Sequence, residues 1–170
     1  MKVLDVTGES VKNTSVMNKI KKAVKTGNTA FFVHASWCPY TVQFYPIWTA
    51  MEAKLKESTD FDIIKLDHES FAHIKKAFPK VYETLADYDE YTESYKLYFP
   101  SVVMFTNGIR KKYSPSERTL KSLVAFIKKY SINKTPNATK PTKATKTTTE
   151  HAHLKLHQQI DKAFSRLMKK

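Results

Sequence analysis

The chain has 170 residues, of which 41% are hydrophobic and only three are glycine, so it can bury a core in one domain and still carry an appended segment. Its single cysteine, Cys38, excludes an internal disulfide and a cysteine-based zinc cluster, and it favours a reducing compartment. The net charge of +13 is unevenly distributed: residues 1–130 hold 20 basic and 14 acidic side chains, whereas residues 131–170 hold nine basic and two acidic ones. A basic segment of this kind favours contact with acidic partners, nucleic acid or anionic lipid.

Strands and helices alternate in the first 67 residues. Short apolar runs predict strands, and apolar positions three or four residues apart predict helices that pack on them. Gly27 marks the predicted end of the first helix, and Pro39 suits the first position of the second. We expect strands at Val3–Val6, Ala30–Val33 and Phe61–Asp67, and helices at Val16–Val24 and from Pro39 to about Glu57.

Cys38 lies where the strand at Ala30–Val33 turns into the helix that begins at Pro39. The first turn of a helix has unpaired backbone N–H groups, and the positive end of the helix dipole adds to their attraction for an anion. A thiolate gains from both, so we expect the pKa of Cys38 to lie below the free value of about 8.5 and the side chain to be an exposed or half-exposed nucleophile. The alternative is a structural cysteine in the core, because free cysteines are often buried.

The stretch from Asp67 to Pro100 keeps a helical spacing that Pro79 interrupts. We therefore expect two short helices, with Pro79 at the start of the second. An acidic segment follows at Asp87–Glu93, with four acids and no base. We interpret it as a solvated insertion loop, or else as a docking loop for a partner or for the cationic C-terminal segment of the same chain.

A hairpin and a closing helix complete the predicted domain. Asn107 and Gly108, between apolar runs at Val102–Phe105 and Ile109–Tyr113, are a strong signal for a two-residue hairpin turn. The closing helix has its apolar positions at helical spacing, so we expect it to pack on the sheet. These positions are Leu120, Leu123, Val124 and Ile127.

The C-terminal segment differs in composition from the rest of the chain. Residues 131–149 are rich in Lys, Thr and Pro and contain no aromatic residue, so they predict a linker without a core. Residues 150–170 regain helical spacing, and this basic amphipathic helix could contact nucleic acid, an anionic membrane or an acidic partner, or only aid solubility. His153 and His157 share one helix face near His151, but too few ligands converge there, so we expect neither a metal nor a cofactor.

Three blocks of the sequence resemble the thioredoxin superfamily. Trp37-Cys38-Pro39-Tyr40 matches the start of the family's Trp-Cys-x-x-Cys motif, and Pro46 lies where the family kinks its active-site helix. The run Phe99–Gly108, with Pro100, is similar to the family's cis-proline loop and the strand and turn after it. The resemblance covers residues 1–130 and implies an α/β thioredoxin fold, a central mixed sheet flanked by helices.

Two positions depart from the family's pattern. Thr41 replaces the second cysteine, and Phe32 replaces the acid that many members bury six positions before the first cysteine. The resemblance therefore implies a monothiol domain in which Thr41 can at most donate a hydrogen bond to the sulfur of Cys38. Phe32 is consistent with this reading, and it also serves simply as core packing.

The resemblance also implies a peptide-binding surface. In the family, the backbone before the cis-proline pairs with an extended client peptide beside the active cysteine, and here that residue is Phe99. Phe99, Trp37 and Tyr40, with Pro39 and Pro100, would then form an apolar platform for the peptide. In the alternative interpretation, Phe99 and Tyr40 are core aromatics.

These observations support three functional hypotheses. In the first, Cys38 forms mixed disulfides with client proteins or glutathione, at most a monothiol thiol–disulfide exchange activity without dithiol turnover. The second is a redox-inactive peptide-binding module that is localised by its basic tail. The third is a structural protein packaged with nucleic acid, such as a component of a virus particle. The N-terminus lacks the apolar core of a signal peptide and no window approaches about 18 apolar residues, so we expect a cytoplasmic protein without a transmembrane segment.

Overall fold

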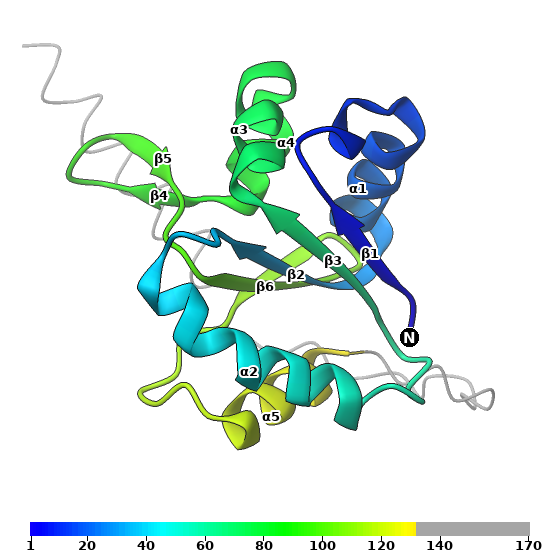
Figure 1. The fold of residues 1–170 in the computed structure, drawn as a ribbon. Coiled ribbons are helices and arrows are strands. Elements are labelled where there is room, and N and C mark those ends of the chain that lie inside the picture. The colour runs from blue at the N-terminus through cyan, green and yellow to red at the C-terminus, as the bar shows by residue number, and fades with distance from the viewer. Residues whose placement is uncertain (132–170) are drawn as a thin grey trace, which may run out of the picture. The chain divides into compact units, whose positions relative to one another are not determined.

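A mixed five-stranded sheet forms the centre of the computed structural model, which describes residues 1–131 (Figure 1). The strand order is β1-β3-β2-β6-β7, with β1 and β2 parallel to β3 and with β6 antiparallel to both β2 and β7. The strands are β1 (Val3–Val6), β2 (Asn28–His34), β3 (Asp62–Asp67), β6 (Ser101–Thr106) and β7 (Ile109–Lys112).

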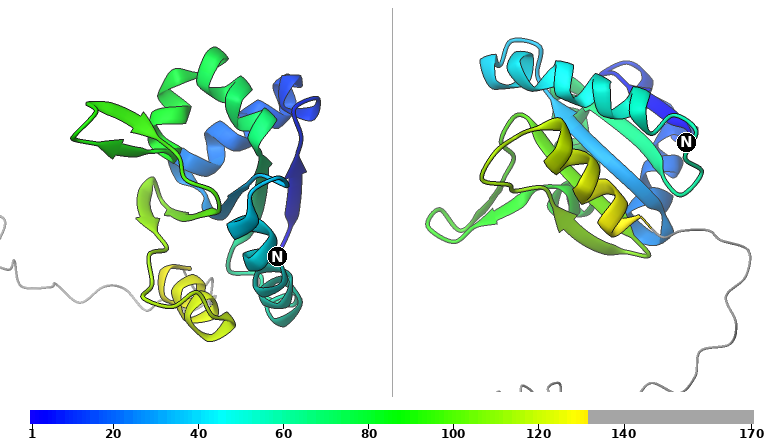
Figure 2. Two further views of the ribbon diagram at one scale, coloured as in Figure 1. Left: turned by 60° about the vertical axis from the view of Figure 1, so that its left-hand side comes forward. Right: turned by 90° about the horizontal axis from the view of Figure 1, so that it is seen from below.

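Helices cover both faces of this sheet. The helices α1, α3 and α4 lie on one face, and α2 and α5 lie side by side on the other (Figures 1 and 2). This arrangement confirms the predicted α/β fold with a central mixed sheet between helices. The helices are α1 (Thr14–Thr26), α2 (Pro39–Lys54), α3 (His68–Ala77), α4 (Pro79–Leu85) and α5 (Leu120–Tyr130), and a short 3₁₀ turn spans Ser10–Lys12.

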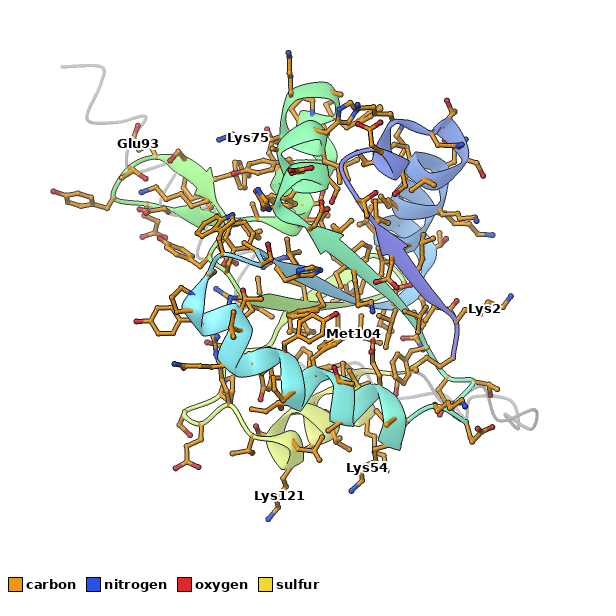
Figure 3. All side chains as sticks on the ribbon, viewed as in Figure 1. Lys2, Lys54, Lys75, Glu93, Met104 and Lys121 are labelled. Carbon is orange, nitrogen blue, oxygen red and sulfur yellow. The ribbon has the colours of Figure 1, made fainter. Side chains whose placement is uncertain are left out.

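The sheet is buried on both faces because β2 and β6 are apolar at successive positions. Alternate side chains of β2 enter different layers: Phe31 packs with the core under α1 and α3, whereas Phe32 packs with the core under α2 and α5. Met104 of β6 lies in this second layer (Figure 3). The turn between β6 and β7 has positive φ at Asn107 (51°) and Gly108 (80°), as the predicted two-residue turn requires.

The acidic segment is a small hairpin rather than the expected loop. Its strands are β4 (Asp87–Asp89) and β5 (Ser94–Lys96), and Glu93 lies near its tip (Figure 3). The carboxylate of Asp87 bonds the guanidinium of Arg110 at 2.7 Å and the ammonium of Lys112. The expectation of a loop without strands was wrong, and the bases that hold Asp87 lie on β7, more than 20 residues away, where no local pattern indicates the ion pairs. The docking role of this segment stays a prediction.

Several expectations lie outside the described residues. These are the linker after Ser131, the basic helix at 150–170 and the histidines near its start. The corresponding domain boundaries remain predictions. Within residues 1–131, each helix is too short or too polar to cross a lipid bilayer.

Candidate functional site

The end of β2 and the start of α2 place Cys38. After His34 the chain turns, and the N–H of Cys38 donates to the carbonyl of Ala35 at 3.0 Å. Cys38 is the N-cap residue of α2 with extended backbone angles (φ −83°, ψ 119°), and Pro39 opens the helix. The thiol therefore lies where the first N–H groups of the helix have no partner in the preceding turn, as the sequence predicts.

A second segment, far away in the sequence, closes over the thiol. The Sγ atom of Cys38 donates to the carbonyl oxygen of Phe99 at 3.5 Å, and the Phe99–Pro100 peptide is cis. Cys38 is only 8% exposed, so the expectation of an exposed or half-exposed side chain was wrong. The loop before β6 lies against the sulfur, and the sequence around Cys38 alone does not indicate that contact.

Thr41 lies one turn into α2 and is almost completely buried, at 2% exposure. Its Oγ1 accepts a hydrogen bond from the N–H of Ala35 at 3.5 Å. A hydroxyl has one proton to donate while it accepts, so Thr41 can direct that proton to the sulfur of Cys38. It therefore links the turn before α2 to the thiol.

The electrostatics around Cys38 favour the thiolate on balance. Burial is the largest influence and raises the pKa of the thiol, because the charged form loses hydration. Hydrogen bonds from the backbone N–H and the hydroxyl of Thr41, and from the backbone N–H of Tyr40, act in the opposite direction. The positive charge of Arg118 adds to them, and the pKa of Cys38 lies below its ordinary value. This is the direction that the helix start predicts.

Exposed aromatic side chains flank the thiol. Trp37 is 64% exposed, and its ring meets the ring of Phe99 edge to face, with centroids 5.8 Å apart. It also contacts His68 at the start of α3, with centroids 5.7 Å apart. Tyr40 is 69% exposed but makes no ring contact within residues 1–131. The structure thus brings the rings of Trp37 and Phe99 together, and the ring of Tyr40 contacts neither of them.

No protein-family model matches the sequence, and no curated protein sequence matches it either. Solved structures do match the fold. The J-Trx1 fragment of ERdj5 aligns with a TM-score of 0.51 and 15% identity over 75% of this chain, and the chain spans about half of that fragment (49%). Thioredoxin NaTrxh from Nicotiana alata aligns with a TM-score of 0.50 and 15% identity, over 77% of this chain and 94% of that one.

The chain has the thioredoxin fold. The blocks that carry the sequence resemblance lie together in this thioredoxin fold, since Cys38 of the first block contacts Phe99 of the second. The helix α2 also contains Pro46, the proline expected within it.

The two departures from the thioredoxin pattern have clear structural roles. Thr41 is a buried alcohol, which cannot exchange with a disulfide. Phe32 is fully buried and stacks on Trp48, with centroids 4.4 Å apart. Lys65, the residue that pairs with Phe32 on β3, is a largely buried base whose ammonium lies 2.8 Å from the exposed carboxylate of Asp5 and 3.7 Å from that of Glu52.

The sequence analysis did not identify two residues of this site. Arg118 precedes α5, and the fold brings its charge near Cys38 and over the ring of Phe44. His68 follows β3 and supports Trp37. Both are about 30 or more residues from the motif, so only the fold reveals their proximity. Within residues 1–131, no group of three potential metal ligands comes together, and the histidines at 151–157 lie outside that range.

Proposed function

We propose that this chain is a monothiol thioredoxin-like protein that forms mixed disulfides through Cys38. The observation that carries the proposal is the position of its Sγ atom, at the N-cap of α2 and 3.5 Å from the carbonyl of Phe99. In the proposed reaction the Cys38 thiolate attacks one sulfur of a client or glutathione disulfide. A new S–S bond forms, the old one breaks, and the departing sulfur leaves as a thiolate that takes up a proton.

The absence of a second thiol determines how the complex is resolved. Full reduction of a disulfide needs two electrons from two thiols, and the sequence contains one cysteine. Thr41 cannot attack the mixed disulfide, so release depends on an external thiol, such as glutathione, or on a second cysteine of the client. We therefore propose exchange or capture without dithiol turnover.

Because of the contact with Phe99, the reaction requires the sulfur of Cys38 to move. The protonated thiol donates to the Phe99 carbonyl, whereas a thiolate has no proton to donate and is repelled by that oxygen. Ionisation therefore favours movement of the sulfur away from Phe99 and towards the donors of Thr41 and Tyr40. A client peptide that pairs with the Phe99 backbone would occupy the same carbonyl and promote this change.

The test is the product formed with an excess of oxidised glutathione. We expect one glutathione per chain, attached at Cys38 and removed by a small reductant, with near-zero reduction of insulin disulfides. Cys38→Ser is the control and should acquire none. Failure of Cys38 to react without denaturant, or steady insulin reduction, would refute the proposal.

A redox-inactive peptide-binding module is the second candidate. The low exposure of Cys38 beside the well-exposed Trp37 favours this alternative, since the aromatic surface is accessible where the sulfur is not. Retention of every bound partner by Cys38→Ser would support the module, whereas loss of the partners would support capture through the thiol.

We also propose that the basic segment at 131–170 determines location or partners, in the cytoplasm or in a virus particle. Its excess of seven positive charges favours nucleic acid, anionic membrane or acidic protein surfaces. Deletion of residues 132–170 should then abolish retention on DNA–cellulose at low salt or change the location of the protein in cells. If neither changes, the segment has no targeting role.

A further inference from the structure

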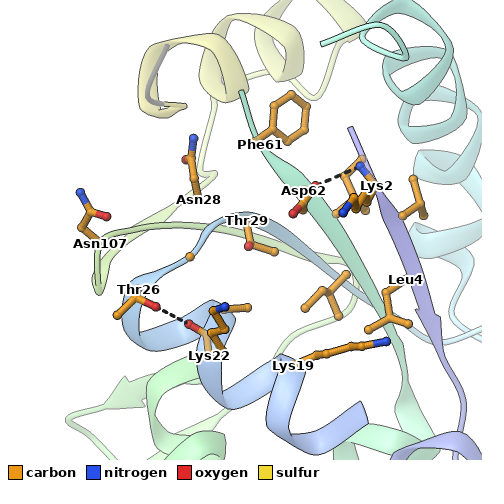
Figure 4. Close-up of a pocket in the computed structure, with 15 residues that line it drawn as sticks. Lys2, Leu4, Lys19, Lys22, Thr26, Asn28, Thr29, Phe61, Asp62 and Asn107 are labelled. Carbon is orange, nitrogen blue, oxygen red and sulfur yellow. Dashed lines mark hydrogen bonds between the residues drawn. The ribbon is translucent and has the colours of Figure 1, made fainter. Parts of the chain in front are cut away.

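A pocket of about 720 Å³ opens at the end of the sheet opposite to Cys38. Its lining includes Asn28 and Thr29 at the start of β2 and Asp62 at the start of β3, whereas Cys38 follows the other end of β2. The second half of α1 and Asn107 complete the wall (Figure 4). This volume lies within the range of about 300–1,000 Å³ that is typical of small-molecule sites.

The inner wall of this pocket is apolar. On the α1 face of the sheet this wall is formed by Ile64 of β3 and Ala23 of α1, which are 4% and 7% exposed, whereas Ile63 and Phe61 border the pocket from the core layer under α2 and α5. Leu4 of β1 is only partly buried and also lines it. Such a wall favours an aliphatic or aromatic body, because burial of apolar surface is the main source of affinity.

The rim of the pocket is cationic. Lys2, Lys19 and Lys22 line it, all three are exposed, and within residues 1–131 none of them forms an ion pair. Lys19 extends from α1 towards Leu4 across the opening (Figure 4). Asp62 is the only acid in the lining, and its Oδ1 accepts a hydrogen bond from the backbone N–H of Lys2 at 3.0 Å. The formal charge of the lining is therefore +2.

We propose that this pocket binds a small amphiphilic anion, an aliphatic chain or ring that carries a carboxylate or a phosphate. The body of the ligand would contact Leu4 and Ile64, which pack in the layer beside α1, and its head group would face the unpaired ammonium groups of Lys19 and Lys22. A purely ionic ligand would leave the apolar wall uncovered, and a cationic amphiphile would be repelled by the rim. The site does not involve Cys38, so it stands independently of the proposed redox function.

The head-group series is the first test, with the full chain labelled with nitrogen-15 and titrated below the micelle concentration. Decanoate should give saturable amide shifts at Lys19, Ala23, Thr29 and Asn107, and it should bind at least tenfold more tightly than decylammonium. Octanoate should bind more weakly, by about fourfold for each methylene group that leaves water. Decyl phosphate in place of decanoate identifies whether the site prefers phosphate or carboxylate. Inorganic phosphate alone should produce no comparable binding.

Charge removal on the rim is the second test. Lys19→Gln with Lys22→Gln should weaken decanoate binding by about threefold to tenfold, as expected for two partly exposed ion pairs. Lys56→Gln with Lys121→Gln removes the same charge outside the pocket and should change nothing. Equal affinity for the decyl carboxylate and ammonium, shifts that lie elsewhere, or no saturable binding of either anion would overturn the proposal. If the double variant does not fold, the head-group series on the wild-type chain tests the proposal by itself.

Discussion

Replacement of Thr41 by cysteine should convert the monothiol site into a dithiol site. The substitution is local: Thr41 is 2% exposed, and its hydroxyl accepts one long hydrogen bond, from the N–H of Ala35 at 3.5 Å. Loss of that bond leaves the buried N–H of Ala35 without this acceptor and should cost about 1–3 kcal/mol, which a domain of ordinary stability tolerates. Residues three apart in a regular helix have Cα atoms about 5 Å apart, within the range of about 4.4–6.8 Å that a disulfide accepts.

The assay counts the thiolate released from Ellman's reagent. In the wild-type chain, Cys38 takes one half of the reagent as a mixed disulfide and releases one thionitrobenzoate per chain. In Thr41→Cys treated with one equivalent of the reagent per chain, the introduced thiol attacks that mixed disulfide at an effective concentration of about millimolar or higher, so a second thionitrobenzoate follows from the same reagent molecule. The expected stoichiometry therefore changes from one to two, and the variant should reduce insulin disulfides.

Thr41→Ser is the matched control, because it keeps the hydroxyl and should remain at one thionitrobenzoate per chain. The reasoning fails if the Thr41→Cys chain keeps its mixed disulfide. It also fails if the wild-type chain, at a concentration too low for two chains to react together, releases two. Either result would mean that Thr41 does not determine the resolution of the complex.

Three further perturbations test the core, the hairpin and the aromatic surface. Phe32→Ala removes a fully buried ring that stacks on Trp48, so the free energy of unfolding measured by urea titration should fall by about 3–5 kcal/mol. A loss below about 1 kcal/mol would contradict this description of the core. Burial raises the pKa of Asp87, but hydrogen bonds from Lys112 and Arg110 outweigh it and hold the pKa below its ordinary range. The contribution of the Asp87 carboxylate to stability is therefore fully present above the unfolded pKa of about 3.9 and is lost as the pH falls through the lower folded value. Asp87→Asn should lower the free energy of unfolding by up to about 1 kcal/mol at pH 7 and by almost nothing at the acid end of this range. Trp37→Ala should weaken binding of a client peptide about fivefold and leave the glutathione adduct unchanged, whereas Tyr91→Ala, at a residue 97% exposed in the hairpin, should change neither.

Much of the secondary structure followed from local chemistry. Pro39 and Pro79 open helices because the N–H that proline lacks has no partner in a first turn anyway, and Asn107 with Gly108 supplies the positive φ angles of a hairpin. The missing second thiol at Thr41 is likewise visible in the sequence without any structure. These features depend on residues within a few positions of one another, and such short windows contain the required information.

Only the tertiary structure decided three features: the low exposure of Cys38, the hairpin formed by the acidic segment, and the pocket with its cationic rim. Phe99 covers the sulfur from 61 positions away, and Asp87 is held by bases on β7. The pocket similarly joins Lys2 to Lys19 and Asp62. Contacts of this kind depend on strand order and helix packing, which place distant segments together, so the spacing of residues along the chain carries no direct signal for them.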